Sequence, residues 1–188
     1  MMAYTPKWND VFKAALHKDL EAVKHFVEKE EDILRSTDGQ GRTVALIAAS
    51  HDDLTLLKYA LETDDSVLLE SDYAGWSIIQ YAIDNGALDT VKYLVEHHKW
   101  DVHHKNRPSL GNTPIHEAAK RGKLEILKYF IEEKKGDKDI RNDFGDPPVF
   151  SAAERPFMKI IRYLVDECKA DLKALNNYNE NILFVAVK

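Results

Sequence analysis

The sequence predicts an all-α solenoid, and two observations support this fold class. Five segments of similar wording begin at Gly41, Gly75, Gly111, Gly145 and Asn179, in steps of 34, 36, 34 and 34 residues. Each of the first four is followed by an apolar stripe at helical spacing. A period of this length is typical of repeat proteins, in which each unit packs only on its neighbours. We therefore expect an elongated stack with a long binding face, and no closed globule around a catalytic pocket.

The clearest copy of the repeated segment, Gly111 to Ala119, predicts two helices and the points where they begin and end. The Thr113 hydroxyl can cap a helix, and Pro114 suits the first helical position. This helix is expected to run to about Arg121, where Gly122 can adopt the left-handed conformation that ends it. The second helix is predicted from the stripe formed by Leu124, Ile126, Leu127, Phe130 and Ile131.

The other units repeat this pattern in their second helices. Their apolar stripes begin at Leu54, Leu88 and Met158, and an earlier copy has Leu20, Val23, Phe26 and Val27. A basic residue followed by tyrosine recurs in these helices at Lys58-Tyr59, Lys92-Tyr93, Lys128-Tyr129 and Arg162-Tyr163. The earliest copy has no preceding turn, so we expect it to be an N-terminal cap.

A period of 34 residues would equally suit a tetratricopeptide array. The sequence motif within each repeat distinguishes the possible repeat families. The phrase Gly-x-Thr-Pro-Ile-His-x-Ala-Ala, complete at Gly111 to Ala119, resembles the ankyrin repeat. The resemblance implies antiparallel helix pairs with a β-hairpin-like turn projecting at about a right angle. It implies a single domain over 1–188 with about five repeats and a partial one. The expected segments are 5–36 as the N-terminal cap, full repeats at 37–70, 71–104, 105–140 and 141–174, and a partial repeat at 175–188.

Some units depart from the ankyrin-like sequence motif. Val44 and Ile78 stand in place of the proline, and Pro147 replaces the capping threonine. Asn179 replaces the turn glycine, which is tolerable because asparagine visits the left-handed region. Two extra residues lie around Arg107-Pro108.

The composition narrows the classes of partner and compartment. A net charge of −6 argues against a nucleic-acid partner, which would need a basic stripe. No stretch approaches the ~18 apolar residues of a membrane span, and Met1 to Lys7 has no apolar run typical of a signal peptide. A single cysteine, Cys168, allows no internal disulfide. These features favour a cytoplasmic protein without membrane insertion.

Two groups of residues resemble metal or catalytic sites, but neither completes one. His97, His98, His103 and His104 are close in sequence, yet they fall after a predicted helix, where neighbouring side chains need not converge. His116 and Glu117 match the start of the zinc-protease motif His-Glu-x-x-His, but Lys120 stands where the second zinc-binding histidine would be. We therefore expect no catalytic residues, no metal and no cofactor. The ankyrin resemblance instead assigns His116 to hydrogen bonding that ties the turn to the first helix.

The resemblance also implies a partner-binding surface, because such stacks usually bind proteins through turn tips and the exposed side of the first helices. The residues expected to contact the partner are Arg42, Tyr73, Trp76, Asn112, Arg121, Phe144, Arg155 and Tyr178. Further positions on the same face include Gln40, Ser50, His51, Asp84, Asn85, Leu110, Lys120, Asp143, Asp146, Glu154 and Glu180. Large aromatic side chains on this face are the type that dominates interface energetics. For Trp76, partner contact is favoured over packing between turns.

The predicted function is a non-catalytic protein-protein interaction module, an adaptor or scaffold. The alternative is a regulatory or targeting segment of a larger enzyme or secreted bacterial effector, and a weaker one is a metal-dependent activity at the histidine cluster. The incomplete last repeat, Asn181 to Lys188, suggests a fragment of a longer array. It also suggests end-to-end association of an otherwise monomeric chain through an uncovered apolar face.

Overall fold

The computed structural model describes residues 7–30, 32–106, 110–155 and 157–187. The chain divides into two compact units, the first ending at Asn85 and the second beginning at Gly86. Each unit is described by itself. The predicted start of the capping repeat at residues 5 and 6, the extra residues around Arg107-Pro108 and the final Lys188 lie outside the described residues.

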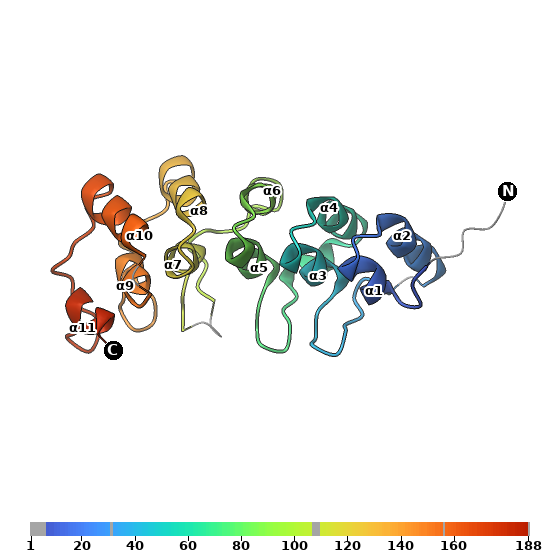
Figure 1. The fold of residues 1–188 in the computed structure, drawn as a ribbon, viewed down its shortest axis with the longest axis horizontal. Coiled ribbons are helices and arrows are strands. Elements are labelled where there is room, and N and C mark those ends of the chain that lie inside the picture. The colour runs from blue at the N-terminus through green and yellow to red at the C-terminus, as the bar shows by residue number, and fades with distance from the viewer. Residues whose placement is uncertain (1–6, 31, 107–109, 156, 188) are drawn as a thin grey trace. The chain divides into compact units, whose positions relative to one another are not determined.

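The first unit consists of short helices joined by turns (Figure 1). The helices are α1 (Val11–Leu16), α2 (Leu20–Lys29), α3 (Val44–Ser50), α4 (Leu54–Thr63), the 3-10 helix η1 (Asp65–Leu69) and α5 (Ile78–Asn85). Helix α3 lies at the centre of this unit, where it packs against α1, α4 and α5. The turns that precede α3 and α5 extend away from the helices on one side.

The second unit repeats the same arrangement with helices of similar length. They are α6 (Leu88–His97), α7 (Pro114–Lys120), α8 (Leu124–Lys128) with η3 (Tyr129–Glu133), α9 (Pro148–Ala153), α10 (Met158–Arg162) with η4 (Tyr163–Glu167), and α11 (Ile182–Ala186). Helix α7 packs against α8 and α9, and α9 packs in turn against α10 and α11. Each first helix therefore contacts its own second helix and the first helix of the next repeat.

Side-chain caps begin most helices of the first unit. The carboxylates of Asp10, Asp19 and Asp53 and the hydroxyl of Thr43 each accept a hydrogen bond from a backbone N–H in the first turn of the helix that follows. These contacts satisfy N–H groups that have no partner inside the helix. At α9, where Pro147 replaces the threonine, no side-chain cap forms.

The second helices of two repeats widen into π-helical turns at a tyrosine. Helix α8 continues as η3 from Tyr129, whose carbonyl accepts the N–H of Lys134 at 3.1 Å. Helix α10 continues as η4 from Tyr163, whose carbonyl accepts the N–H of Cys168 at 3.0 Å. Both tyrosines are buried. Widened turns of this kind are rare within helices.

Small side chains fill the positions where first helices approach their neighbours. Ala48 and Ala49 in α3 and Ala118 and Ala119 in α7 are fully buried. A larger side chain at these positions would hold the helices apart, because protein interiors are close-packed. The paired alanines of the repeated phrase therefore serve packing.

The prediction of an all-α fold is confirmed. Among the described residues, the only β-like features are isolated antiparallel bridges, one between Ser71 and Ser77 and one between Asn106 and Asn112. Each bridge closes a turn before a first helix, as expected for hairpin-like turns. Within the same part of the chain, no helix is both long enough and apolar enough to cross a membrane.

Candidate partner-binding surface

A carboxylate or amide oxygen organises four of the hairpin-like turns. Oδ1 of Asp38, Asp72, Asn142 and Asn176 each accepts hydrogen bonds from the backbone N–H groups two and four residues later, at 2.8–3.0 Å. Short polar side chains favour such turns because they replace a backbone acceptor. These four residues recur with the period of the repeats. These residues stand at matching positions in the chain, so the sequence carries this signal, although it was not among the predictions.

Neighbouring turns within each unit are joined edge to edge by backbone hydrogen bonds. In the first unit, the N–H of Tyr73 donates to the carbonyl of Gln40 at 3.0 Å. In the second, the N–H of Asp143 donates to Leu110 at 3.1 Å, and that of Asn177 donates to Phe144 at 2.8 Å. Successive turns therefore hold their tips in register, and a side chain on one tip lies over the turn before it.

Gly41 shows why the turn glycine matters beyond its backbone angle. Its φ is +79°, a conformation that side chains other than glycine rarely adopt. In addition, a Cβ atom there would collide with the ring of Tyr73 on the next turn. Asn179, the non-glycine residue at the same turn position, has φ +60°, as its ability to visit the left-handed region predicts.

His116 joins a turn, a helix and the next repeat. Its Nδ1 accepts the backbone N–H of Thr113 at 3.2 Å, and its Nε2 donates to the carbonyl of Asp146 at 2.9 Å. The imidazole is completely buried. Burial lowers its pKa to about 4, against its ordinary 6.5, although the hydrogen bond to Asp146 acts in the opposite direction. His116 is thus a neutral structural residue, which confirms the hydrogen-bonding role predicted for it.

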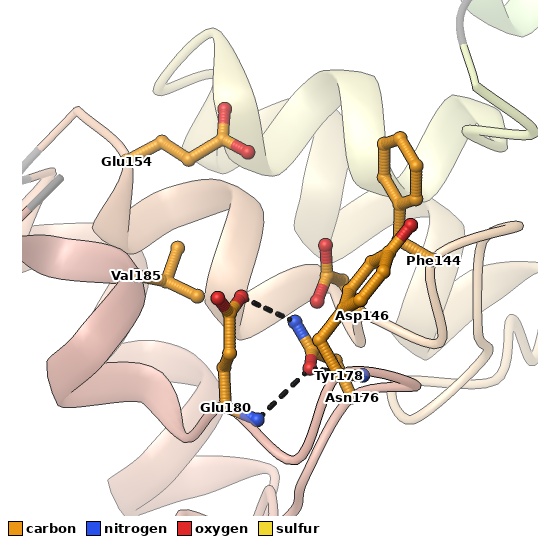
Figure 2. Close-up of a pocket in the computed structure, with 7 residues that line it drawn as sticks. All are labelled: Phe144, Asp146, Glu154, Asn176, Tyr178, Glu180 and Val185. Carbon is orange, nitrogen blue, oxygen red and sulfur yellow. Dashed lines mark hydrogen bonds between the residues drawn. The ribbon is translucent and has the colours of Figure 1, made fainter.

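The second unit contains an open pocket of about 380 Å³ on the turn side of its last repeats (Figure 2). The lining residues come from two successive turns, the end of α9 and helix α11: Phe144, Asp146, Glu154, Asn176, Tyr178, Glu180 and Val185. Five of these were placed on one face from the sequence. Asn176 and Val185 were not, because their contribution depends on how the last turn and α11 fold over α9.

The pocket combines two aromatic rings with three carboxylates. The rings of Phe144 and Tyr178 lie 5.9 Å apart at an angle of 50°. Glu154 forms an ion pair with Lys120 at 3.0 Å. Glu180 accepts a hydrogen bond from the amide of Asn176 at 3.0 Å, as the dashed lines of Figure 2 indicate.

Asp146 lies deepest among these carboxylates. It is 8% exposed, and its Oδ1 accepts no hydrogen bond from any residue that the structure describes. Burial raises the pKa of Asp146 above its ordinary value; the Asn176 amide opposes this, and the charges of Glu154 and Glu180 raise the pKa further. The main cause of the raised pKa is therefore the loss of hydration around a buried carboxylate, and the two neighbouring carboxylates add to it.

Comparison with protein families explains this arrangement of turns and helix pairs. A family model described as ankyrin repeats (3 copies) matches residues 11–106 and 115–188, which is most of the chain. The chain belongs to the ankyrin-repeat family. No curated protein sequence matches it significantly.

A solved structure supports the ankyrin fold. The crystal structure of EF0377, an ankyrin repeat protein, matches with a TM-score of 0.74 at 22% identity, covering 97% of this chain and 92% of that one. The predicted ankyrin-repeat solenoid is therefore confirmed. Ankyrin repeats are generally protein-protein interaction modules without catalytic activity, so the turn tips and first helices are the first place to look for a partner site.

Three of the eight ankyrin residues predicted to contact a partner are exposed. Tyr73 and Tyr178 extend from turn tips and are 78% and 64% exposed. Arg155, which follows α9, is also exposed. Single large aromatic side chains in such positions are available to a partner, and they remain the strongest of the predicted contacts.

Trp76 and Phe144 are half-buried against neighbouring aromatic side chains. The Trp76 ring lies 5.2 Å from that of Tyr81, whose hydroxyl donates to Oδ2 of Asp72 at 2.6 Å. Burial and this carboxylate raise the pKa of Tyr81 to about 12. Trp76 therefore has a packing role at the base of its turn, and its contact with a partner remains a prediction.

Arg42 and Arg121 are engaged within the ankyrin repeats. Nε and an Nη of Arg42 donate to Oδ2 of Asp38 at 2.9 and 2.8 Å. Burial alone would raise the pKa of Asp38, but the hydrogen bonds from Arg42 lower it below its ordinary value. Arg121 lies 3.7 Å from a carboxylate oxygen of Glu117. Both arginines are half-buried, so only part of each faces solvent.

The structure corrects the expected placement of Asn112. Its side chain is not at the surface, since the residue is 5% exposed. Its Nδ2 donates to Glu117 at 3.2 Å, and its Oδ1 accepts from the amide of Asn142 on the next turn at 2.9 Å. Asn112 therefore links successive ankyrin turns. The sequence missed this because turn residues were treated as solvent-facing.

The histidines considered as a metal cluster contact different groups. His97 and His98 lie against the ring of Tyr93, at 5.0 and 5.2 Å between centroids, whereas His103 accepts the N–H of Asp137 at 3.2 Å. Within the described parts of the chain, no group of three histidine, cysteine or acidic side chains is placed to hold a metal ion.

The recurring basic-tyrosine pair has a structural explanation on the second helices. Lys92 lies over the ring of Tyr129 at 5.2 Å, and Lys128 lies over the ring of Tyr163 at 5.4 Å. The lysine of one ankyrin repeat thus covers the tyrosine of the next. These contacts contribute to cohesion between repeats, so this face has a role that does not require a partner.

Proposed function

We propose that this ankyrin-repeat domain is a non-catalytic adaptor or scaffold that binds a protein partner through its turn tips and first helices. The observation that supports the proposal most directly is the exposure of Tyr73 and Tyr178 at turn tips. Tyrosine contributes a large, rigid contact area at low cost in side-chain entropy, and it is enriched among residues that dominate binding energy. In the second unit, the exposed Arg155 and the half-buried Phe144 accompany Tyr178.

The turns suit binding because they are held rigidly. Asp or Asn oxygens fix four of the turns internally, and backbone hydrogen bonds join neighbouring turns within each unit. A surface that is ordered before binding loses little conformational entropy when the partner arrives. The lone cysteine and the acidic composition motivate our proposal of a cytoplasmic setting.

The test is capture of partners from a native lysate on three immobilised forms of the chain, with quantification by mass spectrometry. The forms are the wild type, a Tyr73→Ala/Tyr178→Ala variant and a Leu69→Ala control. Leu69 is an exposed apolar residue in η1, outside the turn tips. We expect a protein set retained by the wild type and the control and lost from the double tyrosine variant. Equal recovery on all three forms would place the binding surface elsewhere.

A second proposal is that the repeats form a regulatory or targeting segment of a larger enzyme or secreted effector. It is favoured by the exposure of Leu183, Phe184 and Val187 on and beside α11, which another helix pair could cover. The mass of the endogenous protein, measured on an immunoblot, tests this proposal. A native product with the mass of this chain alone, 21.5 kDa, contradicts it.

A further inference from the structure

The pocket lined by Phe144, Asp146, Glu154, Tyr178 and Glu180 suggests the chemistry of the partner, and this inference rests on the proposed protein-binding function. The described residues that line it include three carboxylates and no basic side chain, and Lys120, which does not line it, pairs with Glu154. The lining therefore presents excess negative charge to an incoming group. Complementary positive charge on a partner would be attracted to it.

A buried acceptor at the base of the pocket strengthens the argument. Oδ1 of Asp146 is buried and accepts no hydrogen bond from the described residues. Such an atom has lost its hydration without gaining a donor, which is unfavourable. Figure 2 shows the Asp146 carboxylate among the other lining side chains. A ligand that brings an N–H donor to this depth would satisfy Oδ1.

The aromatic rings restrict the kind of donor. Phe144 and Tyr178 lie 5.9 Å apart, and Tyr178 is largely exposed on its turn. Aromatic faces attract cations, and a planar guanidinium stacks on them while its N–H groups reach carboxylates. An ammonium group is more strongly hydrated and offers no planar face. The pocket therefore suits an arginine better than a lysine, because it offers a ring for stacking, a buried carboxylate and further carboxylates at the rim.

We propose that this pocket is a subsite for an arginine side chain of the protein partner. The guanidinium stacks on Tyr178 and Phe144 and donates to Oδ1 of Asp146, and Glu180 lies at the rim as a second acceptor. The volume of about 380 Å³ accommodates one long side chain and leaves the pocket open to solvent. The arginine adds specificity to a larger interface formed by the turn tips.

The experiment titrates isotope-labelled protein with N-acetyl-arginine methylamide and follows the backbone amide signals by NMR. The uncharged probe of the same shape is N-acetyl-citrulline methylamide, and the alternative cation is N-acetyl-lysine methylamide. We expect saturable shifts at the amides of Tyr178, Glu180 and Val185 with the arginine probe, weaker binding of the lysine probe and no saturable shift with citrulline. Equal affinity for lysine overturns the assignment to arginine, and equal shifts with citrulline overturn the role of charge.

Three variants test the residues involved. Asp146→Asn removes the charge with little change of shape, and Tyr178→Leu removes an exposed ring without touching the core. Asp166→Asn is the matched control, because Asp166 is an exposed acid on η4 that does not line the pocket. The first two should weaken arginine binding at least about tenfold, and the control should leave it unchanged. Absence of saturable wild-type binding, or binding unaffected by both Asp146→Asn and Tyr178→Leu, overturns the proposal.

This experiment separates the subsite from the wider function. Binding of the arginine probe needs no partner, so it can succeed even if no protein is captured from a lysate. Conversely, a partner captured through Tyr73 while the arginine probe fails to bind would leave the adaptor function in place and remove the subsite.

Discussion

Nε2 of His116 in α7 donates a hydrogen bond to the backbone carbonyl of Asp146 in the following turn, at 2.9 Å. The same imidazole accepts the N–H of Thr113, so one neutral side chain joins the start of its own helix to the next repeat. Protonation of Nδ1 would abolish its role as an acceptor and place a charge in a buried site. The stability of this region should therefore depend on pH.

The pH dependence follows from the pKa of His116, which is about 4 in the folded chain and ordinarily 6.5. Between these values the unfolded chain binds more protons, so the stabilisation is complete above pH 6.5 and is lost as pH falls toward 4. The loss is up to about 3 kcal/mol. Urea unfolding of the wild type and His116→Gln at several pH values measures it. The variant should show a flatter profile, whereas His104→Gln, at an exposed site, should match the wild type.

Gly41→Ala should destabilise the first unit for two separable reasons. The φ of +79° costs an alanine about 1–2 kcal/mol, and the new Cβ also collides with the ring of Tyr73. Denaturant unfolding should show that Tyr73→Ala relieves part of this loss in the double variant. Gly39→Ala is the control, since a Cβ there meets nothing within 4 Å, and a large loss at that site would contradict the explanation.

Asn112→Ala should reduce stability by about 1–3 kcal/mol and leave partner affinity unchanged, because the side chain links Glu117 to Asn142 below the surface. Thermal or urea unfolding measures the first effect, and the affinity for a captured partner measures the second. The exposed Asn177→Ala should cost less stability. Weaker binding by an Asn112→Ala variant that unfolds like the wild type would restore Asn112 to the partner surface.

The contact between Lys128 and Tyr163 should appear as a coupling free energy of about 0.5–1 kcal/mol in a double-mutant cycle with Lys128→Met and Tyr163→Leu. Tyr163→Phe should retain this coupling, because it keeps the ring and removes only the hydroxyl bonded to Glu132 at 3.0 Å. Lys159→Met serves as an exposed control. A coupling free energy of zero between Lys128→Met and Tyr163→Leu would show that Lys128 contributes nothing to the cohesion between repeats.

Association through α11 is the last prediction. Leu183 and Val187 are among the most exposed apolar side chains of the described residues, so two copies can bury them against each other at high concentration. Sedimentation velocity should show concentration-dependent dimers of the wild type that disappear in Leu183→Lys/Val187→Lys. Identical sedimentation profiles of the wild type and this variant would show that Leu183 and Val187 do not mediate association. The matched substitution Leu69→Lys should leave association unchanged.

The sequence by itself determined the repeat architecture. Turn glycines at a period near 34, paired alanines and apolar stripes at helical spacing are local signals, since each depends on backbone geometry within one repeat. The hydrogen-bonding role of His116 was predicted correctly because it depends on a short sequence motif, the one that resembles the ankyrin repeat. The Asp and Asn residues that organise the turns, such as Asp38 and Asn142, carry an equally local signal that could have predicted their role.

The tertiary structure alone decided which side chains on the turn face are available. Asn112 and Phe144 look alike as turn residues in sequence, yet one is buried between turns and the other lines a pocket. The buried Oδ1 of Asp146 and the placement of Lys128 over Tyr163 likewise arise between repeats. Such relationships depend on how one repeat packs on the next. This packing brings together residues that are about one period apart, so the spacing within a single repeat does not predict them.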